Sequence, residues 1–136
     1  MYLLDTNVVS ELRRPTHTDA RVLAWSRRVA HTDLYLSAIT VLEIEQGALS
    51  AMRRDPTKGA IFLEWLHAQV LPAFKQRILP IDCAAALCCA KLQVPDPKSE
   101  RDALIAATAI ANGMRVVTRN VADFRPMGVD VLNPWE

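Results

Sequence analysis

Four acidic residues lie at comparable junctions along the chain, each where a strand is expected to give way to a helix or just inside the start of a helix. They are Asp5, Glu43, Asp102 and Asp123. In an open α/β sheet, ligands bind at the edge formed by the carboxyl ends of the strands. Four carboxylates gathered there would repel one another unless a cation joined them. The sequence therefore predicts a metal site.

The expected metal is a hard divalent cation, because all four predicted ligands offer carboxylate oxygens. Mg²⁺ takes one or two protein carboxylates directly and keeps several waters, which the remaining acids can hold. Such an ion activates a water molecule and neutralises charge on a phosphate. The chemistry that fits this site best is hydrolysis of a phosphodiester bond.

Asp5 and Asp123 also have structural interpretations. Asp5 could simply cap the helix that follows it, but Thr6 and Asn7 could cap that helix as well. Three cap-forming residues in a row after a buried strand suggest that one of them has another role. Asp123 taken alone could be an ordinary acidic residue of a turn. It is a candidate site residue because the expected strand Val116–Thr118 precedes it.

Glu43 and Asp102 each fit a capping box. A capping box that begins at Thr40 would use Glu43, which could still serve a neighbouring cation. A similar box-like start at Ser99 would include Asp102. A carboxylate in the first turn gains about 0.3–1 kcal/mol from the helix dipole. The small apolar residues of Ala103–Ala111 make an acid at this position unusual for a purely structural cap.

Short apolar runs alternate with longer stretches of helical spacing. Strands are expected at Tyr2–Leu4, Leu34–Leu36, Arg77–Ile81, Val116–Thr118 and Val131–Leu132. Helices are expected at Val8–Arg14, Arg21–Ala30, Val41–Arg54, Ile61–Phe74, Glu100–Asn112 and from a cap at Asp82 through Leu92. This alternation implies a parallel sheet covered on both faces. The predicted fold is a three-layer α/β/α fold with a short-stranded, mostly parallel central sheet, in a single domain over residues 1–136.

Bulk properties narrow the function classes. The net charge is +1, so no global basic field indicates a nucleic-acid binder, and a nuclease would depend on local positive patches and its metal. The four glycines are dispersed, which disfavours a nucleotide-binding glycine loop. We expect no signal peptide, because Asp5 and Glu11 interrupt the N-terminal run and the sequence has no apolar stretch of about 18 residues. We expect a cytoplasmic protein without a membrane partner.

Cysteine and histidine do not compete with the acids as metal ligands. The cysteines form neither a disulfide framework nor a zinc motif, and they predict a buried helix and a reducing compartment: Cys83, Cys88 and Cys89. The histidines lack ligand-like pairing and are expected to be solvated or partly packed: His17, His31 and His67. Glu45 should point away from the face of Glu43 into solvent.

Pairs of arginines end or interrupt the predicted helices, at Arg13-Arg14, Arg27-Arg28 and Arg53-Arg54. They could complement helix dipoles on solvated faces, or they could contact phosphates beside the acidic site and make binding salt-dependent. Arg119 lies between a predicted strand and Asp123. It is the best single candidate for contacting an RNA phosphate.

Several motifs together resemble the PIN domain. They are Leu3-Leu4-Asp5-Thr6-Asn7, Ser37–Thr40 with Glu43 and Gly47, Asp102–Ala109, Thr118-Arg119-Asn120 with Asp123-Phe124, and Asn133-Pro134-Trp135. Each motif is weak alone, but their order and spacing are specific and cover essentially the whole chain. They are similar to the VapC-type toxins of bacterial toxin–antitoxin pairs, including the FitB-like branch.

The resemblance implies a five-stranded parallel sheet between helices and a ribonuclease that depends on Mg²⁺ or Mn²⁺. It also implies a homodimer and a VapB-type antitoxin that blocks the site and binds operator DNA. Matched by position, Asp5, Glu43, Asp102 and Asp123 form the acidic quartet. The supporting polar groups would be Thr6, Thr118 and Asn120. Family members often carry an acid at the position of Asn120, so one-ion chemistry is expected here.

Two other functions remain open on the sequence. One is a non-catalytic regulatory or DNA-binding module that acts with an antitoxin and keeps a vestigial site. The other is a phosphatase with Asp5 as nucleophile, which would normally carry a second acid shortly afterwards, whereas Thr6-Asn7-Val8 supplies none. Cleavage of RNA by the partner-free protein excludes the first alternative, and a phospho-aspartyl adduct would support the second.

Overall fold

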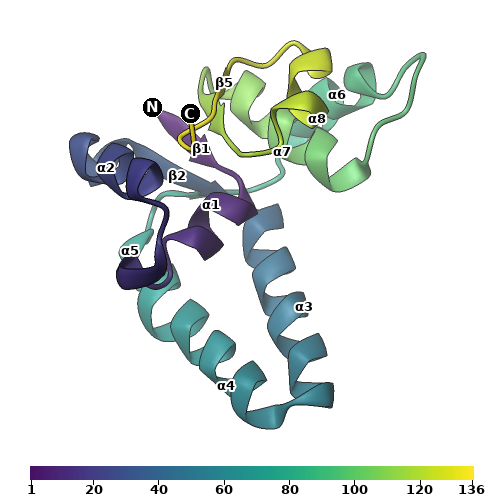
Figure 1. Ribbon diagram of the computed structural model, residues 1–136. Helices are drawn as coiled ribbons and strands as arrows, with labels where there is room; N and C mark the ends of the chain where they lie inside the picture. The colour runs from purple at the N-terminus through teal and green to yellow at the C-terminus, as the bar shows by residue number, and fades with distance from the viewer.

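Five short parallel strands form the centre of the computed structural model, which describes residues 1–136 (Figure 1). They are β1 (Tyr2–Leu4), β2 (Leu34–Ser37), β3 (Ile78–Leu79), β4 (Arg115–Val117) and β5 (Val131–Leu132). Their order in the sheet is β3-β2-β1-β4-β5, and every neighbouring pair is parallel. The parallel sheet predicted from the alternating pattern is confirmed.

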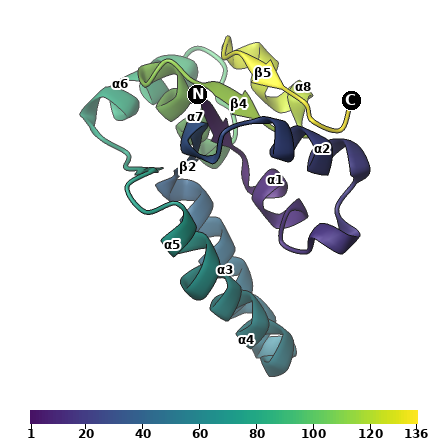
Figure 2. The ribbon, with the colours of Figure 1, turned by 90° about the vertical axis from the view of Figure 1, so that its left-hand side faces the viewer.

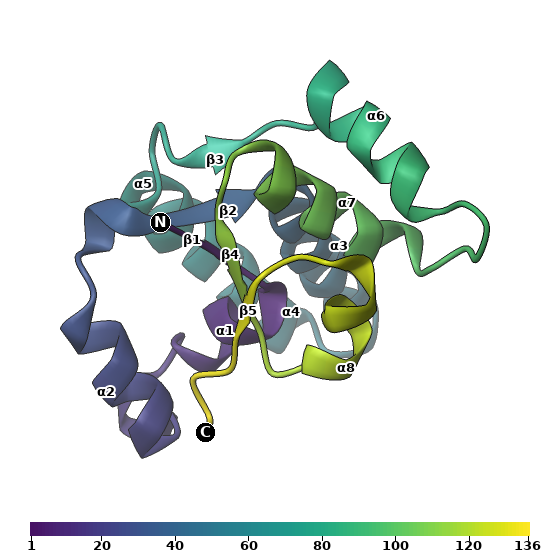
Figure 3. The same ribbon diagram turned by 90° about the horizontal axis from the view of Figure 1, so that it is seen from above.

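Helices cover both faces of this sheet, as the view from above shows (Figure 3). Leu3 and Val116 face one core, which is shared with the buried alanines of α7 (Glu100–Ala111). Leu4 and Val117, one residue further along, face the opposite core, which is shared with α1 (Thr6–Glu11) and α2 (Ala20–Arg28). Successive strand residues point to opposite faces, so an apolar run supplies both cores. The three-layer α/β/α prediction is therefore confirmed.

The remaining helices complete these layers and extend beyond them. They are α3 (Ala38–Arg54), α4 (Pro56–Trp65), α5 (Leu71–Ala73), α6 (Cys83–Leu92) and α8 (Val121–Phe124). A π-helical turn, Leu66–Val70, joins α4 to α5, and three 3₁₀ turns lie at Pro15–His17, His31–Asp33 and Arg125–Met127. No helix is long and apolar enough to cross a bilayer.

Several helix starts differ from the prediction because the residue that caps each helix was misidentified. Asp5 caps α1, so this helix begins at Thr6 rather than Val8. Ser37 caps α3 by accepting the amide N–H of Ile39, which places Thr40 inside the helix instead of at its start. Asp55 caps α4, so this helix begins at Pro56 rather than at Ile61. Proline suits this position because a first-turn N–H has no helical partner.

The helix α6 corrects the prediction of a buried cysteine helix. Only Ala85 and Cys89 are buried, whereas Cys83 is exposed and Leu87 is 62% exposed. An almost wholly apolar sequence predicts burial on all sides. Here the neighbouring α7 covers one side of α6, and the other side faces outward.

The helices α3 and α4 form an antiparallel hairpin that projects away from the sheet (Figures 1 and 2). Their close approach depends on Gly59, which is buried against α3. A Cβ atom at this position would lie 2.5 Å from the amide nitrogen and 2.6 Å from the Cα atom of Met52. Because the obstruction is backbone, it cannot be relieved by a rotamer change.

We expect Gly59→Ala to destabilise the protein by about 1–3 kcal/mol, the usual range for overpacking. The gain in helix propensity from glycine to alanine, about 1 kcal/mol, is too small to reverse this effect. Chemical denaturation measures the change, and Ala60→Ser, at an exposed position of the same helix, is the control. Unchanged or raised stability would mean that the two helices separate readily.

Candidate metal centre

The acidic site lies at the carboxyl edge of the sheet, where the strand order reverses between β1 and β4. Asp5 follows β1 directly and Thr118 follows β4 directly. The amide N–H of Asp5 donates to the carbonyl of Val117 at 2.9 Å, so these two strand ends are held side by side. A reversal of strand order opens a crevice in an α/β sheet, and ligands bind there.

Asp5 is 5% exposed, and both of its carboxylate oxygens accept hydrogen bonds. Oδ1 accepts the amide N–H of Thr6 at 2.8 Å, which caps α1. Oδ2 accepts the Thr118 hydroxyl at 2.8 Å and the Asn7 side-chain amide at 3.2 Å. The structural interpretation of Asp5 as a cap is therefore correct. The cap does not exclude a second role for Asp5, because it uses Oδ1 whereas Oδ2 faces Thr118 at the end of β4.

Thr118 and Asn7 fix this arrangement together. The Thr118 hydroxyl donates to Asp5 and accepts the amide N–H of Asn120 at 2.9 Å. The side-chain amide nitrogen of Asn7 lies 3.3 Å from the same hydroxyl. Its side-chain oxygen, Oδ1, accepts the backbone N–H of Arg119. Asn7 was predicted only as a possible helix cap. The sequence feature that could have indicated this role of Asn7 is its place in the run of three polar residues after β1.

Glu43 is held by a residue far away in the sequence. The Thr6 hydroxyl donates to Glu43 Oε1 at 2.8 Å and lies 3.2 Å from the Thr40 hydroxyl. The predicted capping box at Thr40 is therefore wrong, because Ser37 caps α3 and Glu43 reaches across to α1. The supporting role predicted for Thr6 has a physical basis in this contact.

Asp102 and Asp123 come from α7 and α8, the helices whose buried apolar residues belong to the core of Leu3 and Val116. Asp102 is partly buried in the first turn of α7, and the Ser99 side chain makes no capping hydrogen bond. Asp123 lies in α8, a short helix that the sequence did not predict, and it is exposed. Asn120 precedes α8 with its side chain exposed. The backbone N–H of Asn120 donates to Thr118, and the supporting role of its side chain stays a prediction.

Two of the four acids, Asp5 and Asp102, have raised pKa values. Burial raises the pKa of Asp5, the hydrogen bonds from Thr118 and Thr6 oppose this, and the charges of Glu43 and Asp123 raise it further. Burial also raises the pKa of Asp102, and the charges of the other three acids add to it. This is the repulsion that the sequence predicted, and a cation would relieve it.

The donor set suits a hard cation, although the side chains do not enclose one. No three carboxylate, histidine or cysteine side chains lie close enough together to hold a metal ion directly. An ion with one or two direct carboxylate ligands and several waters requires a wider site than a cage of side chains does. Mutually repelling carboxylates, of which Asp5 is buried, fit such an ion, and no soft ligand competes with them.

Arginine side chains lie around the acids. Arg101 Nη2 donates to Gln46 at 2.6 Å, and its Nη1 is 3.9 Å from Glu43 Oε2. This contact was missed because α3 and α7 are distant in sequence. Arg119 is exposed, with its guanidinium 5.3 Å from the centre of the Trp135 ring. Its contact with an RNA phosphate stays a prediction.

The histidines lie outside the acidic site and are exposed, as predicted. His67 Nε2 lies 2.8 Å from Glu45 Oε2, so Glu45 is paired with a side chain and is only 37% exposed. This corrects the expectation that Glu45 is simply solvated. The pair joins α3 to the π-helical turn and has no contact with the acidic quartet.

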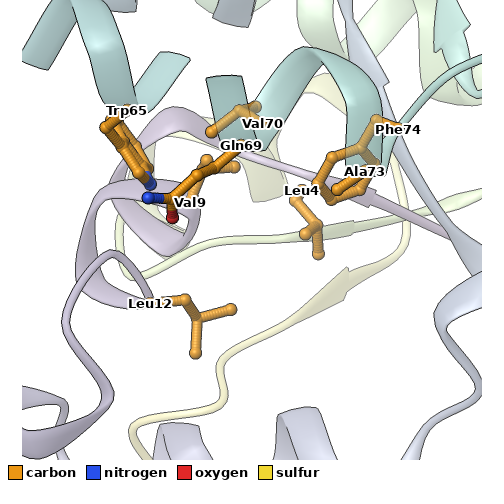
Figure 4. Close-up of a pocket in the computed structure, with 8 residues that line it drawn as sticks. All are labelled: Leu4, Val9, Leu12, Trp65, Gln69, Val70, Ala73 and Phe74. Carbon is orange, nitrogen blue, oxygen red and sulfur yellow. The ribbon is translucent and has the colours of Figure 1, made fainter. Parts of the chain in front are cut away.

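An apolar pocket lies beside α1, as Figure 4 shows. It has a volume of about 180 Å³, and Gln69 is the one polar residue among those that line it. Leu12 and Val9 face Val70 and Phe74 across this hollow (Figure 4). The pocket is lined by no ionisable side chain, so its lining offers no group for acid–base or metal chemistry.

The fold and the acidic quartet together define a known class of protein. Residues 2–127 match the PIN domain, and the chain belongs to this family. The VapC ribonuclease Y4jK of Sinorhizobium fredii is 43% identical over 100% of this chain and 99% of its own length. The toxin FitB of Neisseria gonorrhoeae is 39% identical over 99% of each chain.

The structure of FitAB bound to an IR36 DNA fragment contains a similar chain. The match has a TM-score of 0.87 and 38% identity, and it covers 100% of this chain and 96% of the other. The predicted resemblance to VapC-type and FitB-like proteins is therefore confirmed.

Proposed function

We propose that this protein is a metal-dependent endoribonuclease and the toxin component of a toxin–antitoxin pair. It hydrolyses RNA phosphodiester bonds with carboxylate-bound Mg²⁺ or Mn²⁺. The observation that carries the proposal is the acidic quartet, in which buried Asp5 and partly buried Asp102 have raised pKa values through burial and mutual repulsion. The relationship to a VapC ribonuclease and to the toxin FitB supports it.

Asp5 and Asp102 are the residues that would hold the ion. When bound, the ion would supply a Lewis acid for the phosphate and lower the pKa of a coordinated water. Glu43 and Asp123 would complete the site and orient the attacking water. Thr6 and Thr118 fix the acids through hydrogen bonds of 2.8 Å, so the oxygens are positioned before substrate binds.

The proposed partners follow from the relatives. A VapB-type antitoxin would block the site, and operator DNA would be bound through that antitoxin. The related FitAB assembly was solved with a DNA fragment, which supports this arrangement. A homodimer is part of the same proposal. Exposed apolar side chains such as Leu49 and Ile61 on the α3–α4 hairpin are compatible with association.

We expect the purified, partner-free protein to cut total RNA into discrete fragments in Mg²⁺ or Mn²⁺, and EDTA to stop the reaction. Re-addition of the ion should restore cleavage. Without a cation, the carboxylates offer the RNA phosphate few favourable contacts. Gel analysis and end mapping of the fragments measure this. No cleavage with either ion, from folded protein, would instead favour the non-catalytic DNA-binding module.

A further inference from the structure

A second hollow opens beside Thr6 and Glu43, on the side of the acidic site that faces the hairpin. It has a volume of about 380 Å³, within the range of small-ligand sites. Three helices line it: α1 with Thr6, α3 with Glu43 and Gly47, and α4 with Phe62 and Trp65. Arg13, just after α1, lines it as well. This cleft is mixed in character, unlike the apolar pocket of Figure 4.

Gly47 keeps one wall of this cleft open. It lies in the middle of the 17-residue helix α3, one turn after Glu43. Glycine is the least favourable residue in a helix interior apart from proline. Close packing does not require it, because a Cβ atom here would meet nothing within 4 Å. The glycine therefore weakens α3 without a packing reason, and what it provides is space in the cleft.

Aromatic surface and positive charge meet at Phe62, which lines the cleft together with Arg13. The guanidinium of Arg13 lies 4.8 Å from the centre of the Phe62 ring, and the ammonium of Lys58 lies 5.9 Å from it. Neither cation forms an ion pair with an acid. Aromatic rings flanked by unpaired cations are how proteins bind single-stranded nucleic acid, because bases contact the rings and phosphates contact the cations.

We propose that this cleft binds the nucleotide of substrate RNA next to the scissile phosphate. This inference rests on the proposed ribonuclease function. The base lies against Phe62 and Trp65, the open wall at Gly47 admits it, and Arg13 binds a backbone phosphate. Thr6 and Glu43 belong to both the cleft and the acidic site, so the strand passes from one directly into the other. The charge of Arg13 favours a phosphate-bearing strand over a neutral apolar segment.

The test measures RNA binding by anisotropy, with a labelled single-stranded oligonucleotide of mixed sequence. An Asp5→Asn background keeps the oligonucleotide intact. Gly47→Leu, which fills the cleft, should weaken binding about tenfold while it raises Tm by a few degrees, since leucine favours the helix. Arg13→Met should also weaken binding, and it should reduce the slope of log Kd against log salt by about 0.7, as expected for one phosphate contact. Gly47→Leu should leave that slope unchanged.

Two variants outside the cleft serve as matched controls. Ser50→Leu adds the same side chain at an exposed position of α3, and Lys91→Met removes one positive charge at an exposed position of α6. Both should bind RNA like the background protein. The same changes in the otherwise native chain should raise KM for RNA at the cleft positions and leave it unchanged at the control positions.

Each outcome bears on the inference. Weakened binding by both cleft variants, with controls unaffected, supports it even if the native protein cuts no RNA, which would count against the proposed function alone. Native-like RNA binding and KM in Gly47→Leu and Arg13→Met would overturn the inference about the cleft, while the proposed ribonuclease function would be unaffected. The cleft would then be left for another occupant, such as a peptide segment of a protein partner. An absence of RNA binding in the background protein overturns it as well.

Discussion

Asp5→Asn is expected to reduce RNA cleavage by at least about 10³-fold. Asp5 is the most buried of the four acids, and it joins β1, α1 and β4 through its hydrogen bonds. The substitution removes the charge that would hold the ion, and an ion supplies several kcal/mol of stabilisation to a phosphoryl transition state. A loss of about 4 kcal/mol corresponds to this factor at 1.36 kcal/mol per tenfold change. Initial rates at saturating Mg²⁺ measure the effect.

The fold should survive this substitution. Asparagine caps helices as well as aspartate does, and its carbonyl oxygen can still accept the amide N–H of Thr6. Circular dichroism and Tm therefore serve as the check on folding. Asp96→Asn, in the exposed loop before α7, makes the same chemical change away from the site and should cut RNA at the native rate. Native-like cleavage by folded Asp5→Asn would refute the proposed role of Asp5.

The strands and the gathering of the acids were predictable from local sequence. An apolar run followed directly by Asp5 or by Thr118 marks the end of a buried parallel strand. The carboxyl ends of parallel strands meet at one sheet edge whatever the details of their packing. The same logic predicted repulsion among these acids. Burial is the main cause of the raised pKa values of Asp5 and Asp102, and the charges of the neighbouring acids raise both pKa values further.

The partners of each acid were not predictable, because they come from distant parts of the chain. Glu43 fits a local capping box in the sequence, yet its hydrogen bond goes to Thr6, 37 residues away. Arg101 reaches Gln46 across 55 residues. Local propensity is consistent with several arrangements of a polar side chain, and tertiary packing decides among them. The exposed side of α6 is a similar case, since apolar composition alone indicates burial.

The electrostatic strain of the acidic site has a measurable consequence for stability. Asp102 has a raised pKa in the folded state. As pH rises above the ordinary value of 3.8 towards this raised pKa, the unfolded chain loses its proton first, so the free energy of unfolding falls. Above the folded pKa the loss is complete. At neutral pH the ionised carboxyl therefore destabilises the metal-free protein, and below about pH 3.8 it does not.

Asp102→Asn is expected to raise the Tm of the metal-free protein at pH 7 by roughly 1–3 °C. The gain is small because the side chain is only partly buried and because a first-turn carboxylate also gains from the helix dipole. In Mg²⁺ the order should reverse. At 100 times its dissociation constant, an ion stabilises the native site by about 2.7 kcal/mol, whereas the variant should lose most of this. Thermal melts with EDTA and with Mg²⁺ measure both effects.

The Glu100→Gln variant distinguishes the effect of the helix dipole on Tm from the effect of the acidic site. Glu100 lies in the same first turn of α7, but its side chain is exposed. Its neutralisation should lower Tm slightly with or without Mg²⁺, because only the favourable dipole contact is lost. If Asp102→Asn behaves like Glu100→Gln under both conditions, Asp102 is an ordinary helix-start acid and not a metal ligand. Opposite signs in EDTA, with an Mg²⁺ response that depends on Asp102, would mean that the acids are held together at a cost in stability that the ion offsets.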